Sequence, residues 1–95
     1  MLPEALENEL RAGLKKFAND YRLHVLMRKA LLERDALEEA VTIQEQAAVL
    51  APPSELAAAR QQLLADLLAA GEAALKSGDF DKARRHVKRA QATEL

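Results

Sequence analysis

The chain has 95 residues, a net charge of −1 and no cysteine; 49% of its residues are hydrophobic but 3% are aromatic. The near-neutral charge argues against a strongly cationic nucleic-acid binder, and the lack of cysteine excludes disulfides, thiol catalysis and thiolate metal sites. No apolar run approaches the roughly 20 residues that span a bilayer, and the N-terminus lacks a secretory signal. We therefore expect a cytoplasmic protein without membrane insertion. Strong helix formers dominate, which predicts an all-α fold.

The first predicted helix spans residues 3–18. Pro3 suits a first helical turn, and an apolar stripe recurs at steps of three and four residues. That stripe consists of Leu6, Leu10, Leu14 and Phe17, with Tyr21 continuing it. Asn19-Asp20 either breaks the helix or lies within a longer one. We expect residues 1–20 to form an N-terminal helix for capping or oligomerisation, and 21–95 a helical domain with two irregular hairpins.

From Tyr21 the apolar density increases, which predicts a helix buried between neighbours. Asp35 could begin another helix over residues 35–50, since a periodic stripe resumes after it. No glycine marks this turn, so the two segments could also form one continuous helix. The stripe of 35–50 consists of Leu37, Ala40, Val41 and Ala47.

Pro52-Pro53-Ser54 is the clearest helix stop in the chain, because proline does not fit a helix interior. Ser54 is a suitable N-cap for the next helix. A long helix rich in alanine and leucine is predicted from Glu55 to about Ser77.

Gly78-Asp79-Phe80 predicts a tight turn between two helices. Gly78 can adopt the left-handed conformation that ends a helix, and Asp79 can cap the helix that runs to about Thr93. Small and apolar residues flank the turn at helical spacing, which predicts a hairpin with close backbone approach. They are Leu67, Ala70, Gly71 and Ala74 before the turn, and Ala83, Val87 and Ala90 after it.

These residues resemble the tetratricopeptide repeat, a helix–turn–helix unit with small residues at fixed positions. Residues 64–95 match it well, and residues 22–52 resemble a degenerate copy that ends at Leu50 and Pro52. The resemblance implies antiparallel helical hairpins stacked in the manner of this repeat, with four to five helices in all.

The sequence also departs from the repeat. Arg28 replaces a small residue, Gln44 replaces an aromatic, and Ala40 and Ala83 lie further apart than the usual period of about 34 residues. About three repeats are normally needed for independent stability. We therefore expect helix 3–18, a second protomer or a partner helix to cover the remaining apolar surface.

The resemblance further implies a ligand-facing surface lined by the first helix of each copy, suited to an amphipathic helix or an extended apolar peptide. The alternative is that its leucines belong to the core. The predicted partner-binding residues are Arg22, Val25, Lys29, Leu32, Leu68, Glu72 and Leu75, with Ala65 beside them.

No motif for catalysis, a cofactor or a metal is present. His24 and His86 have no partner at ligand spacing, which favours packing or exposure over chemistry. The acidic segment 33–45 and the basic segment 82–89 occupy the second helices of the two copies. We expect them to lie close and attract each other.

The sequence thus predicts a non-catalytic protein–protein interaction module, of adaptor or small chaperone type, that binds a helical or extended segment of a partner or another copy of itself. One alternative is a nucleic-acid-binding helical dimer that uses residues 82–89. Another is a structural self-assembly subunit that associates through helix 3–18 or helix 55–77.

Overall fold

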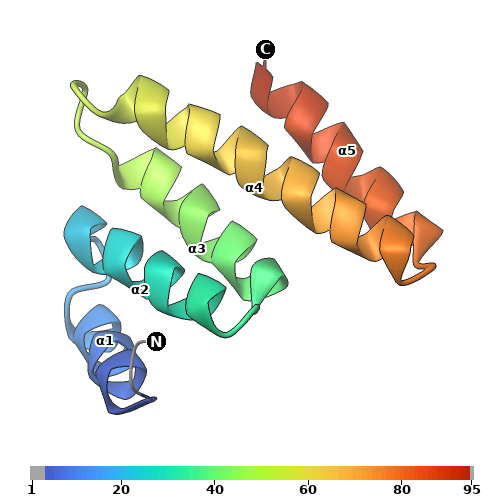
Figure 1. Ribbon diagram of the computed structural model, residues 1–95. Helices are drawn as coiled ribbons and strands as arrows, with labels where there is room; N and C mark the ends of the chain where they lie inside the picture. The colour runs from blue at the N-terminus through green and yellow to red at the C-terminus, as the bar shows by residue number, and fades with distance from the viewer. Residues whose placement is uncertain (1–3, 95) are drawn as a thin grey trace.

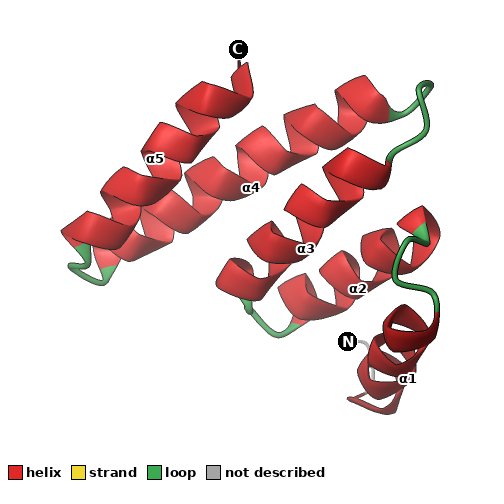
Figure 2. Ribbon diagram, turned by 180° about the vertical axis from the view of Figure 1, so that it is seen from behind, coloured by secondary structure: helices red, strands yellow, loops and turns green. Residues whose placement is uncertain are grey.

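A computed structural model describes residues 4–94, which form five α-helices arranged in chain order (Figure 1). Each helix packs against the next in the chain, and no other pair of described helices packs at the backbone level. Seen from behind, α1 and α5 again lie at opposite ends of this row (Figure 2). The all-α prediction is confirmed, with sequential packing. The helices are α1 (Glu4–Lys16), α2 (Tyr21–Glu33), α3 (Leu37–Leu50), α4 (Leu56–Lys76) and α5 (Phe80–Glu94).

A loop separates α1 from α2, so a single helix through Asn19-Asp20 is excluded. The side chain of Asp20 accepts hydrogen bonds from the N–H groups of Arg22 (2.9 Å) and Leu23 (3.2 Å). This is the N-cap interaction, which satisfies donors that have no partner inside the helix. Phe17 lies beyond the end of α1 and is exposed, so the buried stripe of this helix ends earlier than predicted. Pro3 is outside the described residues.

The turn between α2 and α3 is made by Asp35 in the left-handed conformation, with φ of 60°. The N–H of Asp35 bonds to the carbonyl of Leu32 (3.1 Å), and that of Ala36 to Leu31 (2.9 Å), which is the Schellman pattern of a helix C-terminus. The prediction that Asp35 begins a helix is therefore wrong. It ends the preceding helix, because aspartate tolerates this conformation better than most residues do.

The turn between α4 and α5 has the same pattern, here with glycine. Gly78 has φ of 84°, and its N–H bonds to the carbonyl of Leu75 (3.1 Å), while that of Asp79 bonds to Ala74 (2.9 Å). The carboxylate of Asp79 then accepts from the N–H of Lys82 at 3.1 Å. Both predicted roles, the glycine stop and the aspartate cap, are confirmed.

The prolines end α3 as predicted, but Ser54 does not cap α4. The N–H of Glu55 bonds to the carbonyl of Pro52 (2.8 Å), which places Ser54 inside a turn. Glu55 is the residue at the N-cap position, and its side chain makes no capping bond. The Ser54 prediction is wrong because the turn after the prolines extends one residue further.

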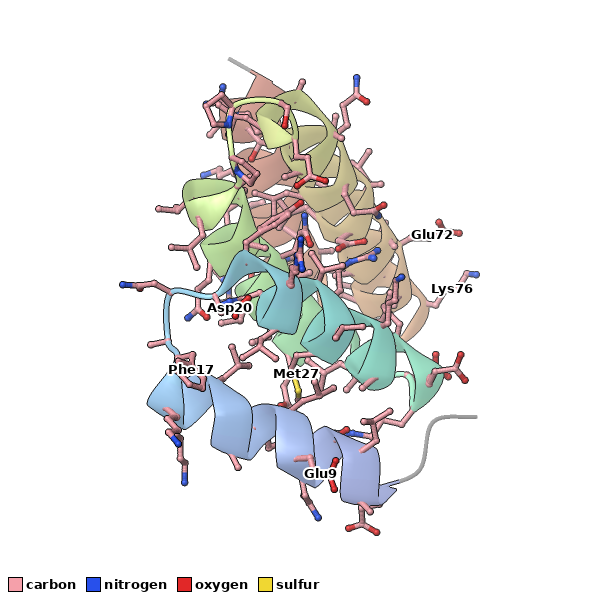
Figure 3. The ribbon with its side chains drawn as sticks, turned by 90° about the vertical axis from the view of Figure 1, so that its left-hand side faces the viewer. Glu9, Phe17, Asp20, Met27, Glu72 and Lys76 are labelled. Carbon is pink, nitrogen blue, oxygen red and sulfur yellow. The ribbon has the colours of Figure 1, made fainter. Side chains whose placement is uncertain are left out.

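Two apolar clusters form the core, and α3 contributes to both. The first joins α1, α2 and α3, and Figure 3 shows Met27 of this cluster between α2 and α1. The second joins α3, α4 and α5. The adjacent residues Ala40 and Val41 belong to different clusters, so α3 separates the two halves of the core. The buried members are Leu10, Met27, Ala30, Leu31 and Ala40 in the first, and Val41, Leu63, Leu67, Ala70 and Ala90 in the second.

Two polar contacts join the hairpin α2–α3 to α4. The guanidinium of Arg28 donates to the carboxylate of Asp66 at 2.6 and 2.8 Å. The side-chain amide of Gln44 donates to the backbone carbonyl of Ala59 at 2.9 Å, and both groups are buried. Arg28 and Gln44 are the two departures from the repeat pattern. Each of them makes a contact that a small or aromatic side chain could not make.

Candidate partner-binding surface

The end of the molecule formed by α4 and α5 exposes a group of large apolar side chains. Leu68 and Leu75 are 49% and 52% exposed, and Phe80 and Val87 are 64% and 40% exposed. We refer to these four residues as the α4–α5 face. Single exposed apolar residues are common on soluble proteins, but a group that shares one face marks a candidate interaction site.

Helix periodicity places the four residues along the line where α4 meets α5, which we call the crease. Gly71 lies against α5, because a Cβ built on it would be 3.6 Å from the Cβ of His86 and 3.7 Å from Cγ2 of Val87. Leu68 and Leu75 are three residues before and four residues after this glycine, so they follow the same side of α4. Phe80 and Val87 are separated by two helical turns and share one side of α5.

This crease faces away from α3. The polar side of α5 that meets α3 carries Lys82, His86 and Arg89, whereas Val87 lies past the line of contact with α4. Within the part of the chain that the structure describes, no helix covers this side of the α4–α5 hairpin.

The opposite end of the row is covered. Leu10 of α1 is buried, and Leu6 and Leu14 pack with it against α2 and α3. Helix α1 thus provides the cover for one end that the sequence called for. The α4–α5 face is the end that stays open.

The predicted attraction between segments 33–45 and 82–89 is confirmed. Glu38 of α3 bonds to Nε2 of His86 at 2.9 Å and lies 3.9 Å from Nζ of Lys82, and Glu45 pairs with Arg89. Such partly exposed pairs contribute under about 1 kcal/mol each. They fix the register of α5 against α3 more than they add stability.

Three cations of α5 take no part in these pairs. Arg84, Arg85 and Lys88 are exposed and have no carboxylate partner among the described side chains. Arg84 lies three residues before Val87 and four after Phe80, so it borders the apolar crease. On the α4 side of the crease, Glu72 pairs with Lys76 at 3.4 Å, and Figure 3 shows both projecting away from the helices.

The predicted partner-binding residues of α2 lie at a different place. Arg22 and Val25 line an open hollow of about 780 Å³ between the start of α2 and the segment before α4. Lys29 is exposed, while Leu32 is half-buried and packs against the first core cluster. The hollow is lined by Asp20, Tyr21, Arg22, Val25, Leu26, Pro52 and Glu55.

The seven predicted residues do not form one continuous surface. Asp66 faces α2, since it bonds to Arg28, and Gly71 faces α5. Leu68 lies two residues beyond Asp66 on α4, about 200° around the helix, and so does not face α2. Glu72 is exposed on α4, where it pairs with Lys76. The predicted residues of α2 and α4 therefore do not form one groove. The two helices are connected by the long polar side chains of Arg28 and Asp66 and not by packed leucines.

A charged network fastens α1 to the rest of the chain. Arg34 donates to Glu7 at 2.7 Å and to Glu39 at 3.1 Å, and Arg11 donates to Glu39 at 2.9 Å and to Glu7 at 3.4 Å. The hydrogen bond from Arg34 lowers the pKa of the Glu7 carboxyl, and that from Arg11 lowers the pKa of Glu39. The network joins α1, the turn after α2, and α3.

Both histidines are buried. Nδ1 of His24 lies 2.8 Å from the carbonyl oxygen of Asp20, and Nε2 of His86 bonds to Glu38. Among the described residues, no three His, Cys, Asp or Glu side chains gather as metal ligands would, and no helix is long and apolar enough to span a membrane.

No protein-family model, curated protein or solved structure matched this chain in the comparisons made.

Proposed function

We propose that the protein is a non-catalytic interaction module, of adaptor or small chaperone type, that binds a helical segment of another protein on its α4–α5 face. The observation that supports this proposal is the asymmetry of the helical row. One end is covered by α1, while the other exposes Leu68, Leu75, Phe80 and Val87. An additional helix in the crease would continue the sequential packing by one layer.

The energetic reason is the burial of apolar surface. Removing a half-exposed leucine or phenylalanine from water contributes roughly 1 kcal/mol at about 25 cal/mol per Å². Four such side chains along the line between two helices can anchor a third helix that packs on both. Anchors of this kind carry most of the affinity in protein–protein interfaces.

The relation to the tetratricopeptide repeat also remains a proposal. It is supported by the Gly78 turn and by the close approach of Gly71 to Ala83, whose carbonyl oxygen would lie 3.7 Å from an added Cβ. The stacking differs from a regular array, since α2 and α4 meet through Arg28 and Asp66 and not through backbone packing.

Nucleic-acid binding by α5 has less support. Lys82, His86 and Arg89 are already paired with carboxylates of α3, which leaves three of the six basic side chains in segment 82–89 for phosphates. A protein with few phosphate contacts binds weakly and loses that binding as salt increases.

The test compares two leucines of similar exposure on different surfaces, Leu68 at 49% and Leu26 at 47%. Leu68→Asp alters the α4–α5 face, while Leu26→Asp alters the hollow beside α2, where Leu26 is 47% exposed. Each purified variant is immobilised and incubated with extract of the source cells, and the bound proteins are quantified by mass spectrometry. We expect Leu68→Asp to lose partners that Leu26→Asp and the wild type retain.

Both variants must keep the helical circular dichroism spectrum and thermal midpoint of the wild type. If the same proteins bind to all three, or if only Leu26→Asp loses them, the α4–α5 face is not the binding surface.

A further inference from the structure

We infer that the partner of the α4–α5 face is an amphipathic helix with an apolar stripe and acidic residues along the edge that meets α5. This inference rests on the proposed function and specifies the chemistry of the segment that is bound. It is carried by the arrangement of charge around the crease.

The apolar part of the crease fits a helix. On α4, Leu68, Gly71 and Leu75 follow steps of three and four residues, the spacing along which helices interlock side by side. Gly71 itself is buried against α5, so an incoming helix would contact the exposed Leu68 and Leu75 on either side of it. An extended peptide that binds by strand addition would need an exposed sheet edge, and the described residues form helices and turns only.

The two edges of the crease differ in charge. On the α5 edge, Arg84 and Lys88 are exposed, and Asp81 is the single carboxylate beside them among the described side chains, while Arg85 lies on the far side of α5. On the α4 edge, Glu72 and Lys76 neutralise each other. An occupant therefore meets a net positive edge on one side and a balanced edge on the other, which favours a helix with glutamates or aspartates facing α5.

A second copy of the chain fits this face less well. A two-fold dimer across the crease would bring two copies of Arg84 and Lys88 into one interface, where like charges oppose association. Head-to-tail stacking would place α1 of the next copy in the crease, but its leucines Leu6, Leu10 and Leu14 already pack against its own chain.

The experiment selects binders from a displayed library of amphipathic helices. The apolar stripe is fixed as leucine at i, i+3, i+4 and i+7, and the positions on both edges are randomised among Glu, Gln and Lys. Selection uses the full chain, in parallel with Leu68→Asp, Leu75→Asp and the matched control Leu26→Asp. Affinities of the enriched helices are then measured by fluorescence anisotropy.

Wild type and Leu26→Asp should enrich helices with Glu along one edge, and these helices should bind Leu68→Asp and Leu75→Asp at least about tenfold more weakly. The double variant Arg84→Glu/Lys88→Glu should reverse the preference and enrich Lys on the same edge. All of these residues are exposed, so each variant is expected to keep the wild-type thermal midpoint, which is checked by circular dichroism.

Four outcomes would overturn the inference. They are a selection that yields no binder, binders without a charge preference, acidic binders that ignore Leu68→Asp, and a wild-type dimer by light scattering that Leu68→Asp converts to monomer. If natural partners are lost in Leu68→Asp while the edge charges have no effect, the proposed interaction module stands and the acidic helix is wrong.

Discussion

Arg28 of α2 and Asp66 of α4 form a two-point ion pair at 2.6 and 2.8 Å between helices that do not pack against each other at the backbone. Their side chains are 15% and 9% exposed, and Gln62 also donates to Asp66 at 3.0 Å. The pair therefore fixes the orientation of the first hairpin relative to α4 across the side of α3.

Removing one partner of this ion pair should be strongly destabilising. Asp66→Ala leaves the Arg28 guanidinium, whose side chain is 15% exposed, without its carboxylate, and the cost should approach the lower end of the about 3–5 kcal/mol found for fully buried pairs. Urea unfolding followed by circular dichroism measures the change. The double variant Arg28→Met/Asp66→Leu should recover most of the loss, because apolar replacement of a whole buried pair is often neutral. A double variant as unstable as Asp66→Ala would contradict this account.

Ala83 should not tolerate a larger side chain. It is buried where α5 approaches Gly71 of α4, so Ala83→Leu forces the two helices apart and should cost about 1–3 kcal/mol. Ala92→Leu on the exposed side of the same helix is the matched control and should change stability by less than about 0.5 kcal/mol. Equal effects at both positions would show that the α4–α5 contact is looser than described.

The two left-handed turn residues should respond oppositely to substitution. A Cβ on Gly78 meets no atom within 4 Å, so Gly78→Ala reports only the cost of φ at 84°, about 1–2 kcal/mol. Asp35→Gly relieves that cost at φ of 60° but adds entropy to the unfolded chain, about 0.5–1 kcal/mol. We expect a net stabilisation below about 1 kcal/mol from Asp35→Gly. Thermal and urea unfolding midpoints should fall for Gly78→Ala and rise for Asp35→Gly.

The attachment of α1 should weaken in acid. The folded pKa values of Glu7 and Glu39 lie below their ordinary value of 4.5, so their stabilising effect is fully present above that pH and is lost as the pH falls through the lowered values. Because the network is exposed, the effect is small and should also decrease with salt. Native-state hydrogen exchange, corrected for the intrinsic pH dependence, should show less protection of α1 at pH 3 than at pH 6.

Arg34→Gln provides the control for that experiment, since Arg34 bonds to both carboxylates. It should reduce the protection of α1 at pH 6 and make it less dependent on pH. An α1 that exchanges equally at both pH values in the wild type would show that its leucines alone hold it.

Local signals in the sequence predicted most of the helices and one of the decisive turns. Gly78 and Asp79 were identifiable because glycine and aspartate have specific conformational and capping roles. Asp35 was misassigned, since the same residue type can begin a helix or end one. Ser54 was misassigned because the hydrogen bond from Glu55 to Pro52 depends on the path of the turn and not on local preference.

The candidate site was predicted only in part. The sequence predicts Leu68 and Leu75 as surface leucines but groups them with Val25 of α2, from which the fold separates them. The sequence pattern predicts Phe80 in the turn and Val87 in the contact between the two helices of the hairpin. Their exposure depends on whether another helix packs on the outer side of the α4–α5 hairpin, and the apolar pattern of one helix does not contain that information.

The sequence by itself determined that the chain is all-α, where its helices stop at Pro52 and Gly78, and that segments 33–45 and 82–89 attract each other, because these follow from short-range conformational preference and charge. Only the tertiary structure decided that α1 covers one end of the row, that Arg28 reaches Asp66, and that Leu68 is exposed on the side of α4 that faces away from α2. These outcomes depend on how each helix is rotated against its neighbours, which is set by the packing of many side chains at once.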